Sequence, residues 1–246
     1  MDENIRAAAD MLSRARKVVA LTGAGISKES GIPTFRDAQT GLWANYNPEE
    51  LATPSAFRRN PGLVWRWYDM RRQALVNVEP NPGHHALVAL EKQLPDLMIV
   101  TQNVDGLHAQ AGSRNVLELH GNITRTKCFD RDHLADHVSL GLDQPPSCTV
   151  CGSLLRPDVV WFEEALPEKE LSIAFEASQS CDVMLVIGTS GLVQPAASLP
   201  LRAKRAGAKL IEVNPTETPI SQIADLHLSG PSGAILPLIV SALATR

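Results

Sequence analysis

Short apolar runs recur along the chain, and most of them end in glycine, asparagine, serine or threonine. Most runs are apolar at every position, which is typical of strands buried on both faces of a parallel sheet. Segments with helical spacing separate them, so the pattern predicts an open α/β sheet whose ligands bind at the carboxyl ends of the strands. The expected strands are residues 17–23, 97–103, 115–121, 157–162, 182–190, 209–214 and 225–230.

The first residues of the chain have the spacing of an amphipathic helix. Ile5, Ala8, Ala9 and Leu12 would lie on one apolar face. Acidic residues near the start argue against a transit peptide, and no signal-peptide pattern is present. We therefore expect a surface helix here rather than a targeting segment.

Two segments interrupt the alternation of strands and helices. Residues 44–80 lack a strand and predict helices around Pro54 and Pro61, whereas residues 124–156 are polar and contain a cysteine cluster. Both are interpreted as inserts that cover an edge of the sheet. The expected division is a main domain of residues 1–43, 81–123 and 157–246, a helical insert at 44–80 and a small insert at 124–156.

Length and charge narrow the class of protein. The 246 residues, 44% of them hydrophobic, suit one large domain or one domain with an insert. A formal net charge of -4 argues against bulk electrostatic binding to nucleic acid. No apolar run approaches the roughly 18 residues that a membrane span requires. We expect a cytoplasmic protein whose partners include neither nucleic acid nor membrane.

The cysteines suggest a metal site. Cys128, Cys148 and Cys151 are close together in the sequence, and the last two have Cys-x2-Cys spacing. In a chain of this length such a cluster favours metal ligation over disulfides, and thus a reducing compartment. Cys181 stands apart at the start of an expected core strand, where a buried structural role is expected.

The loop after the first strand has glycines at positions 23 and 25. A dinucleotide-binding fingerprint would require a third glycine where Lys28 stands. Gly23 and Gly25 could still let the backbone approach a pyrophosphate, with Ser27 capping a helix whose N–H groups face the phosphates. The alternative is a tight turn between strand and helix that binds nothing.

Longer motifs are similar to those of one known family. GAGISKESGIPTFRD (residues 23–37) and GLW (41–43) resemble the first motif of the sirtuins, the NAD-dependent protein lysine deacylases. TQNVDGLH, LELHG, VVWF, GTS and VN follow in the family's order, so the resemblance runs from about residue 17 to 240. It implies a Rossmann-like doubly wound parallel sheet with a smaller, zinc-ribbon-like inserted domain.

The resemblance assigns roles to polar residues at the strand ends. His120, which alone reads as a hydrogen-bonded structural residue, becomes the general base, and its ordinary pKa of about 6.5 suits that task. Asn103 and Asp105, otherwise an Asx turn, would hold the nicotinamide. The implied NAD-binding residues are Gly23, Ala24, Gly25, Ile26, Thr34, Phe35, Arg36, Trp43, Gln102, Asn103, Asp105, Gly188, Thr189, Ser190, Asn214 and Ser232.

The implied reaction is acyl transfer, with His120 and Asn103 as catalytic residues. The acyl oxygen of an acylated lysine attacks the ribose carbon as nicotinamide leaves. His120 takes a proton from a ribose hydroxyl, which then attacks the acyl carbon. Phe35 would shield the reactive carbon, and the products would be lysine, nicotinamide and O-acyl-ADP-ribose.

Two segments are implied to bind the acylated substrate. Val160, Trp161 and Phe162 resemble the segment that pairs with a substrate peptide by β-augmentation. The family usually continues with Gly-Glu, whereas this chain has Glu163-Glu164. The departure puts the local backbone shape in question.

A Tyr-x-x-Arg pair, Tyr68 and Arg71, lies on one face of an expected helix. It resembles the subgroup that removes succinyl or malonyl groups, because arginine and a phenol can bind a carboxylate. The alternative is an ordinary amphipathic helix with its arginines, Arg66, Arg71 and Arg72, in solvent.

The resemblance also implies a structural zinc site, with one departure. The family's second cysteine is replaced by Arg131, and three thiolates alone do not close a tetrahedral structural site. His133 could complete the set, with Asp130 and Asp132 as rivals. The other possibility is that zinc is lost and packing alone holds the small domain.

Other functions stay open at the level of sequence. Mono-ADP-ribosyl transfer would use the same cleavage of NAD, and a non-catalytic NAD-binding module would not need His120, Asn103 and Asp105. A dehydrogenase is least favoured because the fingerprint lacks its third glycine. We expect a monomer that acts on acylated lysine side chains of proteins.

Overall fold

A computed structural model describes residues 3–33, 47–135 and 140–245. Its larger part is a six-stranded parallel sheet with the strand order β3-β2-β1-β7-β8-β9. The order reverses direction between β1 and β7, which is the arrangement of a doubly wound sheet. The strands are β1 (Val18–Thr22), β2 (Leu97–Thr101), β3 (Val116–Glu118), β7 (Val183–Ile187), β8 (Lys209–Asn214) and β9 (Leu226–Ser229).

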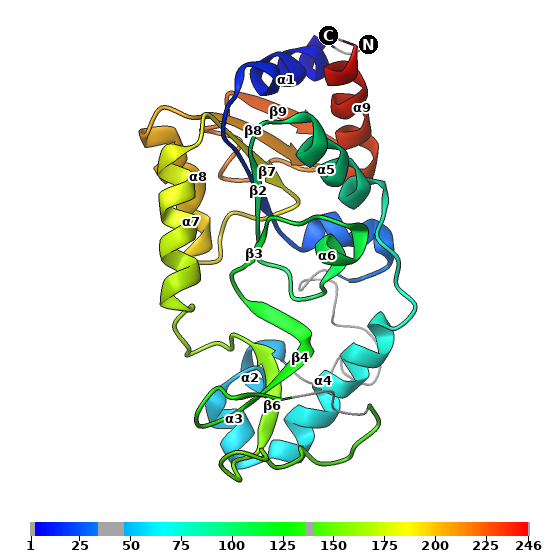
Figure 1. The fold of residues 1–246 in the computed structure, drawn as a ribbon, viewed down its shortest axis with the longest axis vertical. Coiled ribbons are helices and arrows are strands. Elements are labelled where there is room, and N and C mark those ends of the chain that lie inside the picture. Colours follow the sequence, from blue (N-terminus) through cyan, green and yellow to red (C-terminus); the bar gives the residue numbers. More distant parts are fainter. Residues whose placement is uncertain (1–2, 34–46, 136–139, 246) are drawn as a thin grey trace.

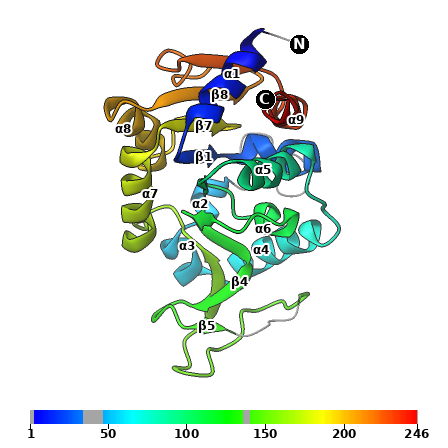
Figure 2. The same cartoon turned by 45° about the horizontal axis from the view of Figure 1, so that its top comes forward.

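Helices cover both faces of this sheet, as Figures 1 and 2 show. Alternate residues of β1 face opposite sides, because successive side chains of a strand point to opposite faces. Val18 and Ala20 pack against one set of helices, whereas Val19 and Leu21 pack against the other. The first set is α1 (Glu3–Arg14), α5 (Pro82–Gln93) and α9 (Ser232–Ala244), and the second is α7 (Glu168–Ser180) and α8 (Leu199–Arg205).

The expected N-terminal helix is confirmed as α1. Its four predicted apolar residues are buried against the sheet and against α9. The short helices α6 (Leu107–Ala111), η1 (Ala24–Ser30) and η3 (Ala196–Ser198) lie in the connections that follow β2, β1 and β7. The doubly wound sheet expected from the apolar runs is therefore confirmed.

A second, three-stranded antiparallel sheet is formed by β4 (Gly121–Cys128), β5 (Leu134–Ala135) and β6 (Leu155–Val159). The strand expected at residues 157–162 thus begins at Leu155, ends at Val159 and belongs to this sheet, not to the parallel one. No strand was expected at β4, because its polar, irregular sequence lacks a continuous apolar run. The register of β4 against β6 shifts between Asn122 and Thr126.

The helical segment contains α2 (Pro48–Leu51), α3 (Pro54–Arg59) and α4 (Pro61–Leu75). Thr53 and Asn60 cap α3 and α4 by accepting hydrogen bonds from Ala56 N (3.0 Å) and Leu63 N (3.1 Å). The helices expected around Pro54 and Pro61 are thus confirmed, and α2 was not predicted. Helix α4 packs on the small sheet, and Figure 1 shows the two together in the lower part of the molecule.

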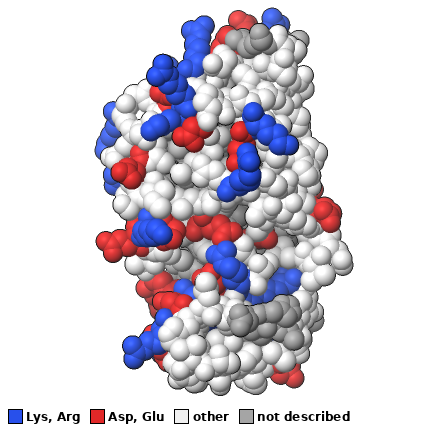
Figure 3. All heavy atoms as spheres, in the orientation of Figure 1, with Lys and Arg blue, Asp and Glu red and all other residues white. Residues whose placement is uncertain are grey.

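We propose that the two sheets mark two lobes of the molecule. On this proposal the expected division changes at two places, because residues 121–123 of β4 and 157–159 of β6 join the small lobe. On the face shown in Figure 3, basic and acidic side chains are interspersed. Within the described ranges, no helix has the length and apolar character to span a membrane.

Candidate active site

The centre of the site is the point where the strand order reverses. The loops after β1 and β7 meet there: Gly25 N donates to the Gly188 carbonyl (2.8 Å), and Gly23 N donates to that of Ile187 (3.0 Å). A Cβ atom on Gly25 would lie only 2.7 Å from the Gly188 Cα. The glycines therefore let two loops pack together, and the crevice at such a reversal is where open α/β sheets bind ligands.

Ser27 does not cap a helix as the sequence suggested. It lies inside η1, which has Gly23 at its N-cap position and no side-chain cap. The buried Ser27 hydroxyl instead donates to Asp105 Oδ2 (2.7 Å) and accepts from Asn103 Nδ2 (3.1 Å). The residue therefore ties the loop after β1 to the loop after β2.

Asn103 and Asp105 lie together in the loop after β2. The buried Asn103 side chain also donates to the Gly23 carbonyl (3.2 Å). Asp105 Oδ1 accepts from Leu107 N (3.0 Å), which is the Asx turn weighed from the sequence. Burial, with a smaller contribution from the charge of Glu118, raises the pKa of Asp105. Neighbouring hydrogen bonds thus hold both side chains at the strand ends.

His120 follows β3 and faces the same edge of the sheet. Its Nδ1 is 2.8 Å from the Gln102 carbonyl oxygen, which can only accept a hydrogen bond. The neutral ring must therefore carry its proton on Nδ1, leaving the lone pair of Nε2 free to accept another proton. Burial lowers the pKa of His120. The side chain thus has the tautomer and charge of a general base at neutral pH.

Several of the expected NAD-binding residues come from the ends of β7 and β8. Gln102 Nε2 donates to Thr189 Oγ1 (3.0 Å), and Asn214 Nδ2 donates to the Thr189 carbonyl (2.9 Å). Ser190 is partly buried in the same loop. The hydroxyl of Ser232, at the start of α9, donates to the Glu29 carboxylate (3.3 Å). Ser232 is therefore already engaged by another loop.

Ala24 and Ile26 complete the described part of the predicted cofactor set, in η1 beside Gly25. Four other predicted cofactor residues lie outside the described residues. These are Thr34, Phe35, Arg36 and Trp43.

A buried hydrogen-bonded chain behind the loops was not predicted. Thr22 and Thr101 end the adjacent strands β1 and β2 in register, and their hydroxyls are 2.8 Å apart. His108 Nε2 lies 2.9 Å from the Thr22 hydroxyl, and Asn103 N donates to that of Thr101 (3.0 Å). Burial lowers the pKa of His108 to about 3, so the ring is neutral. In the sequence, this chain could have been predicted only from the two threonines, which end two of the apolar runs.

Tyr68 and Arg71 lie together on α4, beside the segment expected to bind substrate. Trp161 Nε1 donates to the buried Tyr68 hydroxyl (2.9 Å). The Arg71 guanidinium stacks on Trp67, with Cζ 4.8 Å from its ring centroid, and lies 5.7 Å from that of Tyr68. Burial lowers the pKa of Arg71. No carboxylate among the described residues forms an ion pair with this guanidinium.

The alternative reading of α4 with its arginines in solvent is wrong for Arg72. Its guanidinium is buried and donates to the carbonyls of Ile123 (2.5 Å) and Arg125 (2.8 Å) and to Thr126 Oγ1 (3.0 Å). Arg66 is exposed, as that reading expected.

The segment after β6 keeps a glycine-like backbone although glycine is absent. Glu163 has φ 72, in the left-handed region, and its carboxylate accepts from the Ser55 hydroxyl (3.2 Å). Glu164 pairs with the buried Arg156, whose guanidinium lies 3.3 Å from the Trp161 ring centroid. Val160 N donates to the His120 carbonyl (2.9 Å). This last bond places residues 160–162, the segment expected to bind substrate, directly beside His120.

The cysteine cluster gathers four ligand atoms, all within 4.8 Å of one another, from Cys128, His133, Cys148 and Cys151. Cys128 Sγ is 3.7 Å from Cys151 Sγ and 3.8 Å from His133 Nδ1. Tetrahedral zinc geometry gives about 3.8 Å between two sulfurs and about 3.6 Å between sulfur and nitrogen. The cluster therefore fits a structural zinc ion.

Of the three candidates for the fourth zinc ligand, only His133 lies within the cysteine cluster of the described residues. Asp132 is exposed and pairs with Lys127 (2.9 Å), and Asp130 is exposed outside the cluster. Arg131, at the place of the family's second cysteine, contributes only its backbone N–H, which donates to Cys128 Sγ (3.1 Å). Cys181 is buried before β7, away from this cluster, as expected.

Replacing His133 by alanine is expected to weaken zinc binding by about 100-fold or more, since changes to second-shell partners alone cost 10- to 100-fold. The measurement is zinc content and chelator competition, without reference to activity. Asp132→Ala is the matched control and should retain zinc. Loss of zinc from that control, with retention in His133→Ala, would reverse the assignment.

Comparisons with known proteins agree with this geometry. The Sir2 family model matches residues 23–195. An NAD-dependent protein deacylase of Aquifex aeolicus (strain VF5) is 55% identical over 211 residues, which cover 85% of this chain and 88% of that protein. A Sir2 homologue solved in complex with NAD has a TM-score of 0.93 at 45% identity, with 100% of this chain and 94% of that chain covered.

A more distant solved structure is Sir2Af2, described as bound to a myristoylated histone peptide. Its TM-score is 0.78 at 36% identity, with 100% of this chain and 98% of that chain covered. The match to the family model spans both lobes and includes the loops after β1, β2, β3 and β7. On this evidence the chain belongs to the Sir2 family, the sirtuins.

Proposed function

We propose that this chain is an NAD-dependent protein lysine deacylase that releases nicotinamide and O-acyl-ADP-ribose. The observation that carries the proposal is the placement of His120. The His120 ring bonds through Nδ1 to Gln102, in the loop after β2, and leaves Nε2 free. The backbone carbonyl of the same residue accepts from Val160 N, in the segment proposed to bind substrate. His120 therefore contacts both the cofactor loops and that segment. Relatives named NAD-dependent protein deacylase, such as that of Aquifex aeolicus (strain VF5), support the same reaction.

The residues that would hold NAD surround the strand reversal. The donor and acceptor set fits a dinucleotide, because amide, hydroxyl and carboxylate groups from four strand ends converge on one edge. We assign the adenosine side to Gly188, Thr189, Ser190 and Asn214, and the nicotinamide side to Gln102, Asn103 and Asp105. Bound NAD supplies the ADP-ribose group that accepts the acyl group. Phe35 and Arg36 stay proposals from the resemblance.

The protein residues divide the chemical work. Asn103 donates from its amide and Asp105 accepts at its carboxylate, a pairing that suits a carboxamide and orients it. His120 Nε2 accepts a proton from a ribose hydroxyl, while its Nδ1–H stays bonded to the Gln102 carbonyl. The buried Thr22–His108 contact supports the loop that carries Asn103.

The substrate peptide would pair with residues 160–162 through backbone carbonyl groups, of which that of Trp161 already accepts from Glu164 N (3.1 Å). The N–H groups of Val160, Trp161 and Phe162 already donate to His120 O, Glu164 Oε2 and Ala52 O. A peptide strand that donates its own N–H groups is therefore complementary to this edge. We propose a monomer, as expected from the sequence. Its free cysteines favour a reducing compartment such as the cytoplasm.

We further propose that acidic acyl groups are preferred. Arg71 is partly buried without a described carboxylate partner, and a guanidinium in that position binds a carboxylate strongly. Tyr68 accepts a hydrogen bond from Trp161, which leaves its own hydroxyl proton to donate. Succinyl or malonyl lysine would supply the missing carboxylate at the end of a chain long enough to reach the pair.

The proposed function is tested by the products. The chain is incubated with labelled NAD and acylated lysine peptides, and nicotinamide and O-acyl-ADP-ribose are quantified by mass spectrometry. We expect one of each product per lysine released. Label that stays covalently on protein, without free O-acyl-ADP-ribose, would identify mono-ADP-ribosyl transfer instead. No nicotinamide release with any acyl peptide would indicate a non-catalytic module.

A further inference from the structure

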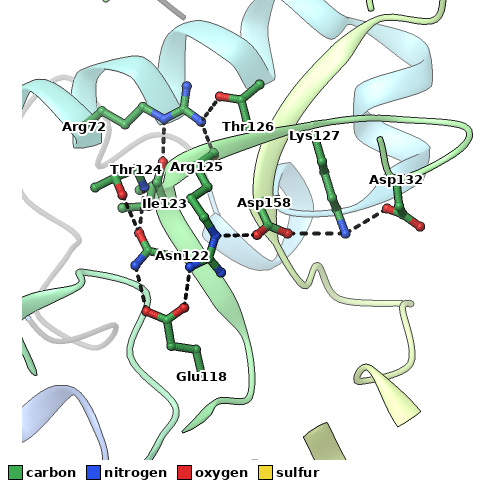
Figure 4. Close-up of polar contacts among 10 residues, drawn as sticks. All are labelled: Arg72, Glu118, Asn122, Ile123, Thr124, Arg125, Thr126, Lys127, Asp132 and Asp158. Carbon is green, nitrogen blue, oxygen red and sulfur yellow. Dashed lines mark hydrogen bonds and ion pairs between the residues drawn. The ribbon is translucent and has the colours of Figure 1, made fainter. Parts of the chain in front are cut away.

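The side chain of Arg125 joins the two sheets of the molecule. It projects from β4, where Nη1 pairs with Glu118 Oε2 (2.7 Å) and Nε with Asp158 Oδ2 (2.9 Å). Glu118 ends β3 of the parallel sheet, and Asp158 lies on β6 of the antiparallel sheet. Figure 4 shows the guanidinium between the two carboxylates. One cation therefore bridges strands of different lobes.

Both carboxylates lie close to the reacting residues along the chain. Glu118 precedes His120 by two positions, and Asp158 precedes Val160 by two. The backbone bond between Val160 N and the His120 carbonyl joins residues that closely follow these two strands, β3 and β6. The bridge therefore lies beside the point where the base meets the substrate segment.

A third element of the site contacts this network through Asn122. Its Nδ2 donates to Glu118 Oε1 (2.7 Å), and its Oδ1 accepts from the N–H (3.0 Å) and hydroxyl (2.7 Å) of Thr124. These bonds fix the side-chain amide of Asn122, which packs against Gly106. A Cβ atom on Gly106 would lie only 3.2 Å from Asn122 Nδ2. The position of Glu118 thus also affects the loop that carries Asn103 and Asp105.

The backbone of Arg125 is itself held in place. It lies within the register shift of β4, where the ladder to β6 is interrupted. The buried Arg72 guanidinium donates to the carbonyls of Ile123 and Arg125 across this irregular stretch. The backbone from which the Arg125 side chain extends is therefore fixed, which favours a defined geometry of the bridge.

We propose that Arg125 is a positioning residue for deacylation, which holds the end of β3, and with it His120, at a fixed distance from residues 160–162. The assignment rests on the proposed function. A simple surface ion pair is the competing interpretation, because the Arg125 side chain is 45% exposed. Exposed pairs stabilise a fold little, so the two interpretations differ in what the loss of Arg125 affects. Positioning affects turnover, and surface pairing affects neither turnover nor binding.

The test compares Arg125→Met with Arg114→Met. Arg114 is the matched control, an exposed arginine that approaches Glu91 (3.9 Å) outside the site. We expect Arg125→Met to lower kcat for the acyl peptide about tenfold, with KM and NAD affinity within twofold of the wild type. A misaligned base slows the chemical step without removing a contact to either ligand. Arg114→Met should match the wild type throughout.

A double-mutant cycle on kcat/KM with Glu118→Gln and Arg125→Met separates positioning from global destabilisation. Assays are run well below both unfolding temperatures. We expect strong non-additivity, since either change breaks the same bridge. Turnover in Arg125→Met within twofold of the wild type, or an additive cycle, would overturn the assignment. No turnover in the wild-type chain would overturn the proposed function itself and this assignment with it.

Discussion

Replacing His120 by alanine is expected to reduce deacylation about 10²- to 10⁴-fold, the usual contribution of a general base. The Nδ1–H bond to the Gln102 carbonyl leaves only Nε2 to accept a proton, and burial lowers the pKa so that this nitrogen is unprotonated at pH 7. No other described histidine lies beside the substrate segment. The measurement is steady-state release of nicotinamide and O-acyl-ADP-ribose from an acyl peptide.

NAD binding is expected to survive the same substitution. The hydrogen bonds that join the loops after β1 and β7 do not involve His120, so the main cofactor surface should persist. Calorimetric titration with NAD measures this directly. His85→Ala, an exposed histidine on α5, is the control and should behave as the wild type. Full turnover in His120→Ala would refute the mechanism.

Replacing Arg71 by methionine is expected to lower kcat/KM for succinyl and malonyl lysine about 10- to 150-fold. Hydrogen bonds to charged groups contribute about 1.5–3 kcal/mol, which corresponds to this range for a partly buried guanidinium. Methionine keeps an unbranched side chain of similar length but removes the guanidinium, including its stacking on Trp67. Acetyl lysine has no carboxylate and should change little.

The measurement compares acetyl, succinyl and malonyl forms of one peptide with wild type and variant. Arg66→Met is the matched control on the same helix, because its exposed guanidinium donates to the Asp143 carbonyl (3.0 Å) and not to the acyl region. Equal losses on all three acyl groups would sink the assignment of Tyr68 and Arg71 to an acidic acyl group.

The sequence predicted the large sheet because short, continuous apolar runs are typical of strands that are buried on both faces of a parallel sheet. β1, β2, β7 and β8 are buried on both faces, and their polar ends could be identified from their position alone. The carboxyl ends of parallel strands share one edge, so Gln102, His120 and Thr189 could be expected close together. That expectation required only the order of the elements.

The small sheet was less predictable because its strands are polar on one side. β4 alternates irregularly, contains a register shift and is stabilised by Arg72 from a helix distant in sequence. No local pattern indicates that Arg72 is buried whereas Arg66 on the same helix is not. The burial of a charge depends on partners that the chain supplies from elsewhere.

The sequence by itself determined the order of the strands in the large sheet along the chain, the family and the residue types at the strand ends. Only the tertiary structure decided which nitrogen of His120 is free, that Ser27 ties two loops together, and that His133 completes the cysteine set. These properties depend on distances between side chains far apart in the sequence. The periodicity of a sequence predicts which face of a helix or strand is buried. Hydrogen bonds, ion pairs and metal ligation depend instead on which side chains from other elements pack against that face.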